Sequence, residues 1–334
     1  MINTNQNFSK DLNDWGKRKI PFVFLIDFLL KKPVAWRLND INPAEILFDF
    51  NGFNNVATHV ESNPLSDFYF QKNPVPFDTY QEKFNHVVKN LKAGNSFLVN
   101  LSVPTPIETN LDLNDIFRYS KAPYRFWAKD QFVCFSPEIF IKIKDKKISS
   151  FPMKGTIDAS FPNAEKVILS DPKEAAEHAT IVDLIRNDIS IVADKVWVER
   201  YRYIEPVQTH QKTLLQVSSE IAGLLPGNFD GEYGDLLLKL LPAGSISGAP
   251  KPSTLQIIAD TEGYERGYYT GVMGYFDGNN FESAVMIRYI EKQEGKLVFK
   301  SGGGITARSD AQSEYQELID KVYLPFAHVP AAVL

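Results

Sequence analysis

One lysine in this sequence has neighbours that suit covalent chemistry. Lys154 lies in Phe151-Pro-Met-Lys-Gly-Thr156, where proline restricts the backbone on one side and glycine frees it on the other. Alternating apolar residues upstream predict strands that deliver this lysine to a turn. A lysine amine can act as a nucleophile when a desolvated site keeps part of it neutral. A solvated turn lysine is the more frequent case, so the other motifs of the chain decide between the two.

Two predicted helices each carry a pair of glutamates three residues apart, Glu174 with Glu177 and Glu314 with Glu317. Side chains at positions i and i+3 are neighbours on a helix, so each pair presents two carboxylates on one face. Either pair alone is most often a solvated helix face. If the two pairs converge, their four carboxylates would suit a hard dication such as Mg²⁺ together with an anionic substrate group. The spacing by itself leaves both interpretations open.

Two segments of small residues could approach an anion closely. Leu241-Pro-Ala-Gly-Ser-Ile-Ser-Gly-Ala-Pro-Lys-Pro252 leaves amides and the hydroxyl of Ser245 free before a predicted helix. Ser301-Gly-Gly-Gly-Ile-Thr306 is predicted as a loop between a strand and the last helix, and its glycines allow close backbone contact. Arg288, midway along a predicted apolar strand, could bind a carboxylate through two hydrogen bonds. A buried ion pair is the alternative for this arginine.

Composition excludes several classes of partner. The chain has 334 residues, of which 36 are Lys or Arg and 41 are Asp or Glu, so its net charge of −5 gives no electrostatic basis for binding nucleic acid or an anionic membrane. The apolar run Phe22–Leu30 is too short to span a bilayer and contains Asp27. The single cysteine, Cys134, excludes an internal disulfide framework and a multi-cysteine metal site. We therefore expect a cytoplasmic protein.

The elements that must position these residues come as runs of strands with helices between the groups. Helices are predicted over 79–93, 172–192, 231–240, 253–261 and 310–323. Strands are predicted over 96–102, 123–129, 131–135, 138–151, 195–204, 214–221, 268–276, 281–290 and 296–300. Because helices and strands do not alternate strictly, this order favours an α+β fold over a doubly wound sheet.

Four motifs, in family order, resemble those of the chorismate-utilising enzymes, which include anthranilate synthase component I, aminodeoxychorismate synthase component I and the isochorismate and salicylate synthases. The motifs are Pro152-Met-Lys-Gly-Thr156, Glu177-His-Ala-Thr-Ile-Val-Asp-Leu-Ile-Arg-Asn-Asp188, Gly244-Ser-Ile-Ser-Gly-Ala-Pro-Lys251, and Gly302-Gly-Gly-Ile-Thr306 followed by Glu314-Tyr-Gln-Glu317. The resemblance implies large, twisted, mostly antiparallel sheets packed as a sandwich with helices outside. It also implies one chorismate-binding catalytic domain over 1–334, with 1–78 a shortened N-terminal portion and 79–326 the core.

Within that family, position 154 separates the branches. The anthranilate and isochorismate branches usually have alanine there, whereas aminodeoxychorismate synthase has lysine. Leu98 lies where isochorismate-forming members use a lysine to activate water, and leucine cannot act as a base. The resemblance thus implies a transferase that aminates chorismate at C4, giving 4-amino-4-deoxychorismate for 4-aminobenzoate and folate biosynthesis. Anthranilate synthase, which aminates C2 and eliminates pyruvate, and a non-catalytic anion-binding relative are the alternatives.

The resemblance also implies a metal site. Magnesium would be held by Glu177 and Glu317, with Glu174 and Glu314 assisting through water. The metal would bind the ring carboxylate of chorismate, and Lys321, one helical turn after Glu317, would pair with the same carboxylate. Mg²⁺ is the one cofactor expected, and neither a redox cofactor nor pyridoxal phosphate is required.

The same resemblance implies the catalytic groups. Glu138 would act as general acid on the departing C4 hydroxyl, and Lys154 would add at C2 before ammonia attacks C4 and expels it. The enolpyruvyl carboxylate would be held by a set of polar residues and glycines, namely Tyr275, Arg288, Ser245, Gly302, Gly303 and Gly304.

Some positions depart from the family pattern. Ile157-Asp-Ala-Ser160 lacks the basic run that often follows the Gly-Thr, and Gln216 stands where relatives have a histidine, which weakens any role for His210. The shortened N-terminal portion makes a tryptophan pocket doubtful. Because Cys134 lacks the glycine-flanked turn of an amidotransferase nucleophile, we expect ammonia to come from a glutamine amidotransferase subunit or from solution.

Overall fold

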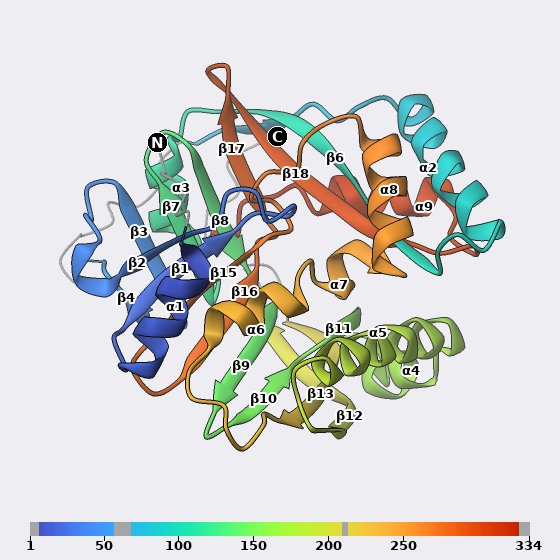
Figure 1. Cartoon of the computed structure of the whole chain (residues 1–334). Helices are drawn as coiled ribbons and strands as arrows, with labels where there is room; N and C mark the ends of the chain where they lie inside the picture. Colours follow the sequence, from blue (N-terminus) through green and yellow to red (C-terminus); the bar gives the residue numbers. More distant parts are fainter. Residues whose placement is uncertain (1–6, 57–67, 209–212, 327–334) are drawn as a thin grey trace.

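The computed structural model describes residues 7–56, 68–208 and 213–326, and over these ranges the strands form two nine-stranded sheets (Figure 1). One sheet has the order β11 (Met153–Asp158), β13 (Thr213–Leu224), β10 (Lys147–Ser150), β9 (Ile139–Lys144), β16 (Phe281–Val285), β15 (Val272–Phe276), β1 (Phe22–Ile26) and β2 (Val34–Arg37), with β12 (Lys195–Gln208) beside β13. The other has the order β14 (Gly248–Ala249), β6 (Leu98–Thr109), β18 (Lys296–Ile305), β17 (Tyr289–Gln293), β8 (Phe132–Ser136), β7 (Tyr124–Ala128), β3 (Ile46–Phe50) and β4 (Phe53–Asn54), with β5 (Phe70–Lys72) beside β6. His210 lies outside the described residues.

Strand β1 shows why the sheets stack. Successive side chains of a strand point to opposite faces, and on β1 both faces are apolar. Phe22, Phe24 and Ile26 pack beneath α1 (Phe8–Lys17), α5 (Pro172–Ser190) and α6 (Tyr233–Leu240). Val23 and Leu25 pack instead against residues of the second sheet. The first sheet is therefore covered by helices on one face and by the other sheet on the opposite face.

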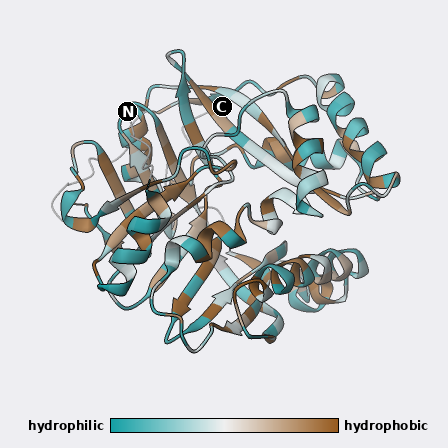
Figure 2. Ribbon diagram, viewed as in Figure 1, coloured by the Kyte–Doolittle hydropathy of each residue, from teal (hydrophilic) through white to brown (hydrophobic). Residues whose placement is uncertain are grey.

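The second sheet has its own outer layer of helices. Apolar residues of α2 (Phe77–Lys92), α8 (Lys251–Glu262) and α9 (Ala311–Asp320) pack on β6 and β18, and α3 (Leu113–Tyr119) covers β7 and β8. Hydrophobic residues follow the strands in the middle of the molecule, whereas much of the surrounding helices and turns is hydrophilic (Figure 2). This order of layers confirms the expected α+β sandwich. Short helical segments complete it: η1 (Leu38–Asp40), α4 (Ala164–Ser170) and α7 (Gly244–Ser247).

The structure corrects three predicted elements. The strand predicted over 138–151 is a hairpin, in which β9 and β10 pair antiparallel. The strand predicted over 281–290 is broken, because β16 ends in one sheet at Val285 and β17 begins in the other at Tyr289. The predicted loop over 301–306 is largely strand, because β18 continues to Ile305 with its glycines paired to β6. Glycine lacks a side chain to signal a strand, and the pairing with β6 supplies what local propensity does not. Within the described ranges, no helix is long and apolar enough to cross a membrane.

Candidate active site

Two crossovers between the sheets meet at one seam. The chain leaves β8 and enters β9 through Glu138, and it leaves β16 and enters β17 through Arg288. The backbones lie side by side, since the amide of Val285 donates to the carbonyl of Glu138 at 3.0 Å and the amide of Phe135 donates to the carbonyl of Arg288 at 3.1 Å. A carboxyl group and a guanidinium from residues 150 positions apart are thereby held in one place.

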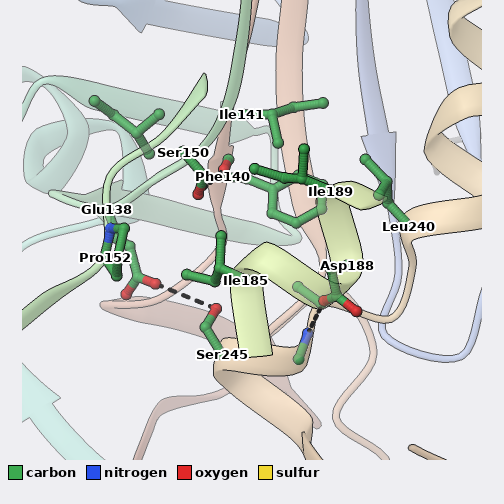
Figure 3. A pocket seen from close by; sticks show the side chains of 13 residues that line it. Glu138, Phe140, Ile141, Ser150, Pro152, Ile185, Asp188, Ile189, Leu240 and Ser245 are labelled. Atoms are coloured by element: carbon green, nitrogen blue, oxygen red, sulfur yellow. Dashed lines mark hydrogen bonds between the residues drawn. The ribbon is translucent and has the colours of Figure 1, made fainter. Parts of the chain in front are cut away.

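Glu138 is set up as a proton donor. Burial raises the pKa of its carboxyl, and the opposing charges of Arg288 and Lys321 and the hydrogen bond from Ser245 do not cancel that rise. The Ser245 hydroxyl donates a long hydrogen bond of 3.5 Å to Glu138 Oε1 (Figure 3). Because the neutral acid persists to higher pH than in a free glutamate, the group suits protonation of a leaving hydroxyl.

Arg288 has the form of an anion-binding group. Its φ of 56° lies in the left-handed region, which is uncommon outside glycine and is found often at functional sites. Within the described residues its buried Nε has no hydrogen-bond partner, and the guanidinium lies 5.5 Å from the centre of the Tyr323 ring. A buried donor without a protein acceptor is costly, so a ligand carboxylate is the natural complement. The buried ion pair considered as an alternative is absent from the described residues.

Lys154 lies in a strand rather than in the predicted turn. It belongs to β11, whose pairing with β13 slips between Met153 and Thr156, and the next residue, Gly155, has a φ of +82°. The irregularity lets the side chain reach α5, where Nζ lies 2.8 Å from Glu177 Oε2. Burial lowers the pKa of the Lys154 ammonium, but the hydrogen bond and charge of Glu177, with the charges of Glu317 and Glu174, more than offset it, and the net pKa is raised.

The glutamate pairs on α5 and α9 lie close enough for their charges to affect one another. Burial raises the pKa of Glu174, Lys154 opposes that rise, and Glu177 adds to it. Burial also raises the pKa of Glu314, with Glu317 and Glu177 contributing, so charges on the two helices act on each other. Burial would raise the pKa of Glu317 as well, but Lys321, at 2.6 Å, holds it below its ordinary value. The two pairs therefore share one electrostatic field.

The donor chemistry of these glutamates fits magnesium, but their present arrangement is not that of a metal site. Glu174 Oε2 is buried and has no hydrogen-bond partner in the part of the chain that the structure describes, which leaves an oxygen ligand unused. Yet no group of three or more His, Cys, Asp or Glu side chains within 7–56, 68–208 and 213–326 lies at metal-ligand spacing. Lysines occupy the two central carboxylates, Glu177 and Glu317. A cation could replace those ion pairs, since carboxylate oxygens are the ligands magnesium takes.

The glycines of β18, Gly302–Gly304 (the glycine strand), lie beside Lys321 and Glu314 of the site. The ammonium of Lys321 donates to the carbonyl of Gly302 at 2.9 Å, and burial lowers the pKa of this lysine despite its pairing with Glu317. A Cβ added at Gly303 would lie 3.5 Å from Glu314 Oε2 and 3.7 Å from Lys321 Nζ. Leu98 is buried on β6 beside Gly304, so the side chain at this point is apolar and carries no proton-accepting group.

One predicted substrate residue is not brought to this centre. Tyr275 stacks on Phe53 at 4.3 Å between ring centres and on Phe50 at 5.9 Å, and burial raises its pKa to about 12. Tyr269, six positions earlier, is buried and feels the charge of Arg288, which opposes the effect of burial on its pKa. Both tyrosines lie within the strand predicted over 268–276, so the sequence offers no signal that separates them. The structure separates them, because Tyr269 lies near Arg288 and Tyr275 packs against Phe50 and Phe53.

Comparisons with known proteins identify the family of this chain. The family model for chorismate binding enzyme matches residues 44–326, and the chain therefore belongs to that family. It is an enzyme family acting on chorismate. The "Uncharacterized PabA-like protein" of Haemophilus influenzae is 50% identical over 322 residues, which are 96% of this chain and 97% of the relative.

More distant relatives carry names of specific reactions. "Aminodeoxychorismate synthase component 1" of Klebsiella aerogenes is 32% identical over 260 residues, 73% of this chain and 56% of the relative. "Anthranilate synthase component 1" of Acetivibrio thermocellus is 33% identical over 246 residues, 69% of this chain and 49% of the relative. The solved structure of MenF, the menaquinone-specific isochorismate synthase from Escherichia coli, superposes with a TM-score of 0.71 at 17% identity, covering 93% of this chain and 79% of that one. This likeness supports the fold.

Proposed function

We propose that this enzyme aminates chorismate at C4 to give 4-amino-4-deoxychorismate, the precursor of 4-aminobenzoate in folate biosynthesis. The observation that carries the proposal is the place of Lys154: its Nζ lies 2.8 Å from Glu177 Oε2 at the centre that also holds Glu317 and Arg288. A solvated surface lysine would not be surrounded in this way. The amine is thus available to a substrate bound between the two glutamate pairs.

The proposed reaction has two steps, addition of the lysine with loss of water and displacement of the lysine by ammonia. Lys154 Nζ bonds to C2, both ring double bonds shift (C1–C2 to C1–C6 and C5–C6 to C4–C5), and the C4–O bond breaks as Glu138 gives its proton to the hydroxyl, which leaves as water. Ammonia then bonds to C4, both double bonds return, and the C2–N bond breaks to release the neutral lysine amine. The proton lost from the new C4 ammonium returns to Glu138. Arg288 would hold the enolpyruvyl carboxylate with Ser245 and the glycine strand, and Lys321 would pair with the ring carboxylate.

The proposed magnesium would be held by Glu177 and Glu317, with Glu174 and Glu314 beside them. When bound, it supplies positive charge that neutralises these acids and attracts the ring carboxylate. Lys154 would then keep the effect of burial, which lowers its pKa, and lose the compensating charge of its glutamates. The lysine could thereby lose its proton at neutral pH, which a nucleophilic amine must do.

Anthranilate formation is the second candidate, because the anthranilate synthase relative is as similar as the aminodeoxychorismate synthase relative. Overall similarity therefore does not choose between the two reactions. Lys154 favours C4 amination, since direct attack of ammonia at C2 needs no enzyme nucleophile. The ammonia would be delivered in the cytoplasm by a glutamine amidotransferase subunit.

The test is product identity. Purified chain with chorismate, Mg²⁺ and ammonium should form 4-amino-4-deoxychorismate, identified by mass and by conversion with a lyase, at a rate that rises with pH as free ammonia forms. Glutamine should support no turnover until a glutaminase is added. Without ammonia, a mass adduct should appear on the peptide that contains Lys154. Anthranilate as the main product would reject the proposal, and glutamine-dependent turnover by the chain alone would reject the separate partner.

A further inference from the structure

Asp188 is a buried carboxylate that the proposed reaction does not use. It lies near the end of α5, the helix that carries Glu174 and Glu177, and its two oxygens have different partners. Oδ1 lies 2.7 Å from Lys251 Nζ, and Oδ2 accepts the backbone N–H of Gly244 at 3.0 Å. Burial raises the pKa of Asp188, although Lys251 and the Gly244 amide oppose that rise. A buried charge of this kind costs stability unless it is paired on all sides, and here it is paired.

These contacts fix the segment that carries Ser245. Gly244 opens α7 and Ser245 follows it directly, so the amide held by Asp188 is adjacent to the serine. A Cβ at Gly244 would lie 2.9 Å from Asp188 Oδ2, so the backbone needs glycine to come this close. Lys251 also donates to the carbonyl of Leu240 at 2.8 Å, which ties both flanks of the segment to the same ion pair.

The side chain of Ser245 borders free space, although its chain neighbours Ala243 and Ile246 are buried in the core. A small cavity of about 20 Å³ lies beside the serine, with room for about one water. Glu138, Asp188 and Ser245 line this cavity together with apolar residues of β9, α5 and α6 (Figure 3). Because free space adjoins the serine side chain, the ion pair and hydrogen bonds that hold its backbone contribute to where its hydroxyl lies.

We propose that Asp188, paired with Lys251, is a positioning residue that holds Ser245 against the general acid Glu138 and ties that contact to the glutamate-bearing helix α5. The chain of contacts runs from Lys251 to Asp188, to the Gly244 amide, and through Ser245 to Glu138 Oε1. The inference rests on the chorismate-consuming activity of the proposed function and not on which product forms.

A double-mutant cycle tests this proposal, with chorismate consumption as the assay. Asp188→Asn keeps the shape of the side chain and removes its charge, and Ser245→Ala removes the hydroxyl. Asp188→Asn should lower kcat about tenfold and change KM less than about threefold, since substrate contacts remain. If Asp188 acts through Ser245, the double variant should lose no more than the larger single loss. Multiplied losses, about 100-fold if each variant loses tenfold, would overturn the proposal.

A matched control separates positioning from stability. Asp49 on β3 pairs with Arg125 on β7 at a similar degree of burial, in a part of the sandwich without site residues. Asp49→Asn should lower Tm yet leave kcat within about twofold. Asp188→Asn that behaves in the same way would show a merely structural role. If Asp188→Asn does not fold, Lys251→Met replaces it in the same cycle.

Crystal structures give a measure that does not depend on the reaction. The wild type should show Ser245 Oγ at about the present 3.5 Å from Glu138 Oε1, and Asp188→Asn should show the serine displaced toward the cavity. An unmoved Ser245 in the variant would overturn the proposal even if the enzyme proved to make another product. Failure of wild-type chorismate consumption, by contrast, would reject the proposed function and leave this structural test in force.

Discussion

Two lysine–glutamate pairs lie on opposite sides of the site and differ in origin. On α9, Lys321 pairs with Glu317 at 2.6 Å, four residues earlier on the same helix. On the other side, Lys154 of β11 reaches across to Glu177 of α5 at 2.8 Å. The first pair follows from helix periodicity, whereas the second exists because a strand irregularity aims a side chain at a neighbouring helix.

The contacts are alike, yet the pKa values of the two lysines move in opposite directions. Burial lowers the pKa of Lys321, and nearby Arg288 and Lys154 add to that decrease. The pKa of Lys154 is raised, because three glutamates outweigh the effect of burial. The surrounding charges, and not the paired glutamate alone, set the protonation of each lysine. Lys154 is the lysine with more acidic neighbours, so its pKa should fall when those glutamates are neutralised.

The strongest test of this comparison removes the two paired glutamates in turn. Glu177→Gln and Glu317→Gln should each abolish chorismate turnover while circular dichroism and gel filtration stay as in the wild type. Each change removes a proposed charged ligand and leaves a site that magnesium fills poorly. Turnover near the wild-type rate at saturating Mg²⁺ in either variant would contradict the metal assignment. An intact Mg²⁺-induced rise in Tm would do the same.

The two lysines should differ in kinetic effect. Lys154→Ala should lose about 1000-fold in 4-amino-4-deoxychorismate formation, which is about 4 kcal/mol in the barrier, yet still bind chorismate. Any residual turnover should give the C2-aminated product. Lys321→Ala should act chiefly on KM, because this lysine is assigned to a carboxylate of the substrate. Initial rates and product masses measure both, and wild-type amination by Lys154→Ala would remove the main support for the C4 route.

The raised pKa of Glu138 predicts that both stability and turnover depend on pH. Its folded-state pKa is raised, so the neutral form stabilises the fold at low pH, and that contribution is lost as pH rises through the folded value. The proton needed for catalysis is lost over the same range, so kcat corrected for free ammonia should fall there. Glu138→Gln should be about 100-fold slower and lack this decrease. A pH–rate profile measures both, and an unchanged profile in the variant would exclude Glu138 as the acid.

The smallest expected effect is on the free energy of unfolding, and it compares a glycine beside Lys154 with a glycine beside Lys321. Gly155→Ala forces a side chain into a φ of +82° and toward Glu174 Oε2 at 2.7 Å, so it should destabilise the protein by about 1–2 kcal/mol. Gly303→Ala meets only ordinary contacts, and its effect should stay within about 0.5 kcal/mol. Urea unfolding of both variants without Mg²⁺ compares them. Equal losses would show that the β11 irregularity is not specifically required.

The periodicity of apolar residues predicted many of the helices and strands. The strand at Arg288 was predicted wrongly, and the reason is physical. The helix predicted over 172–192 is α5 (Pro172–Ser190), and that over 79–93 is α2 (Phe77–Lys92). The sequence predicts Arg288 within one strand, because the residues around it from Ala284 to Tyr289 are apolar, but the strand breaks there and the chain changes sheets. Burial on both faces of a sandwich makes such a crossover look like continuous strand.

The sequence by itself determined which groups the site contains: a lysine beside a glycine, two glutamate pairs at helical spacing, an arginine and a run of glycines. These follow from local rules that need no partner in space. Only the tertiary structure decided that Glu138 and Arg288 share a seam, that Lys154 points at Glu177, and that Tyr275 packs in the core away from them. Those outcomes depend on strand register, sheet crossovers and burial, which bring together residues far apart in the chain and fix the field around each charge.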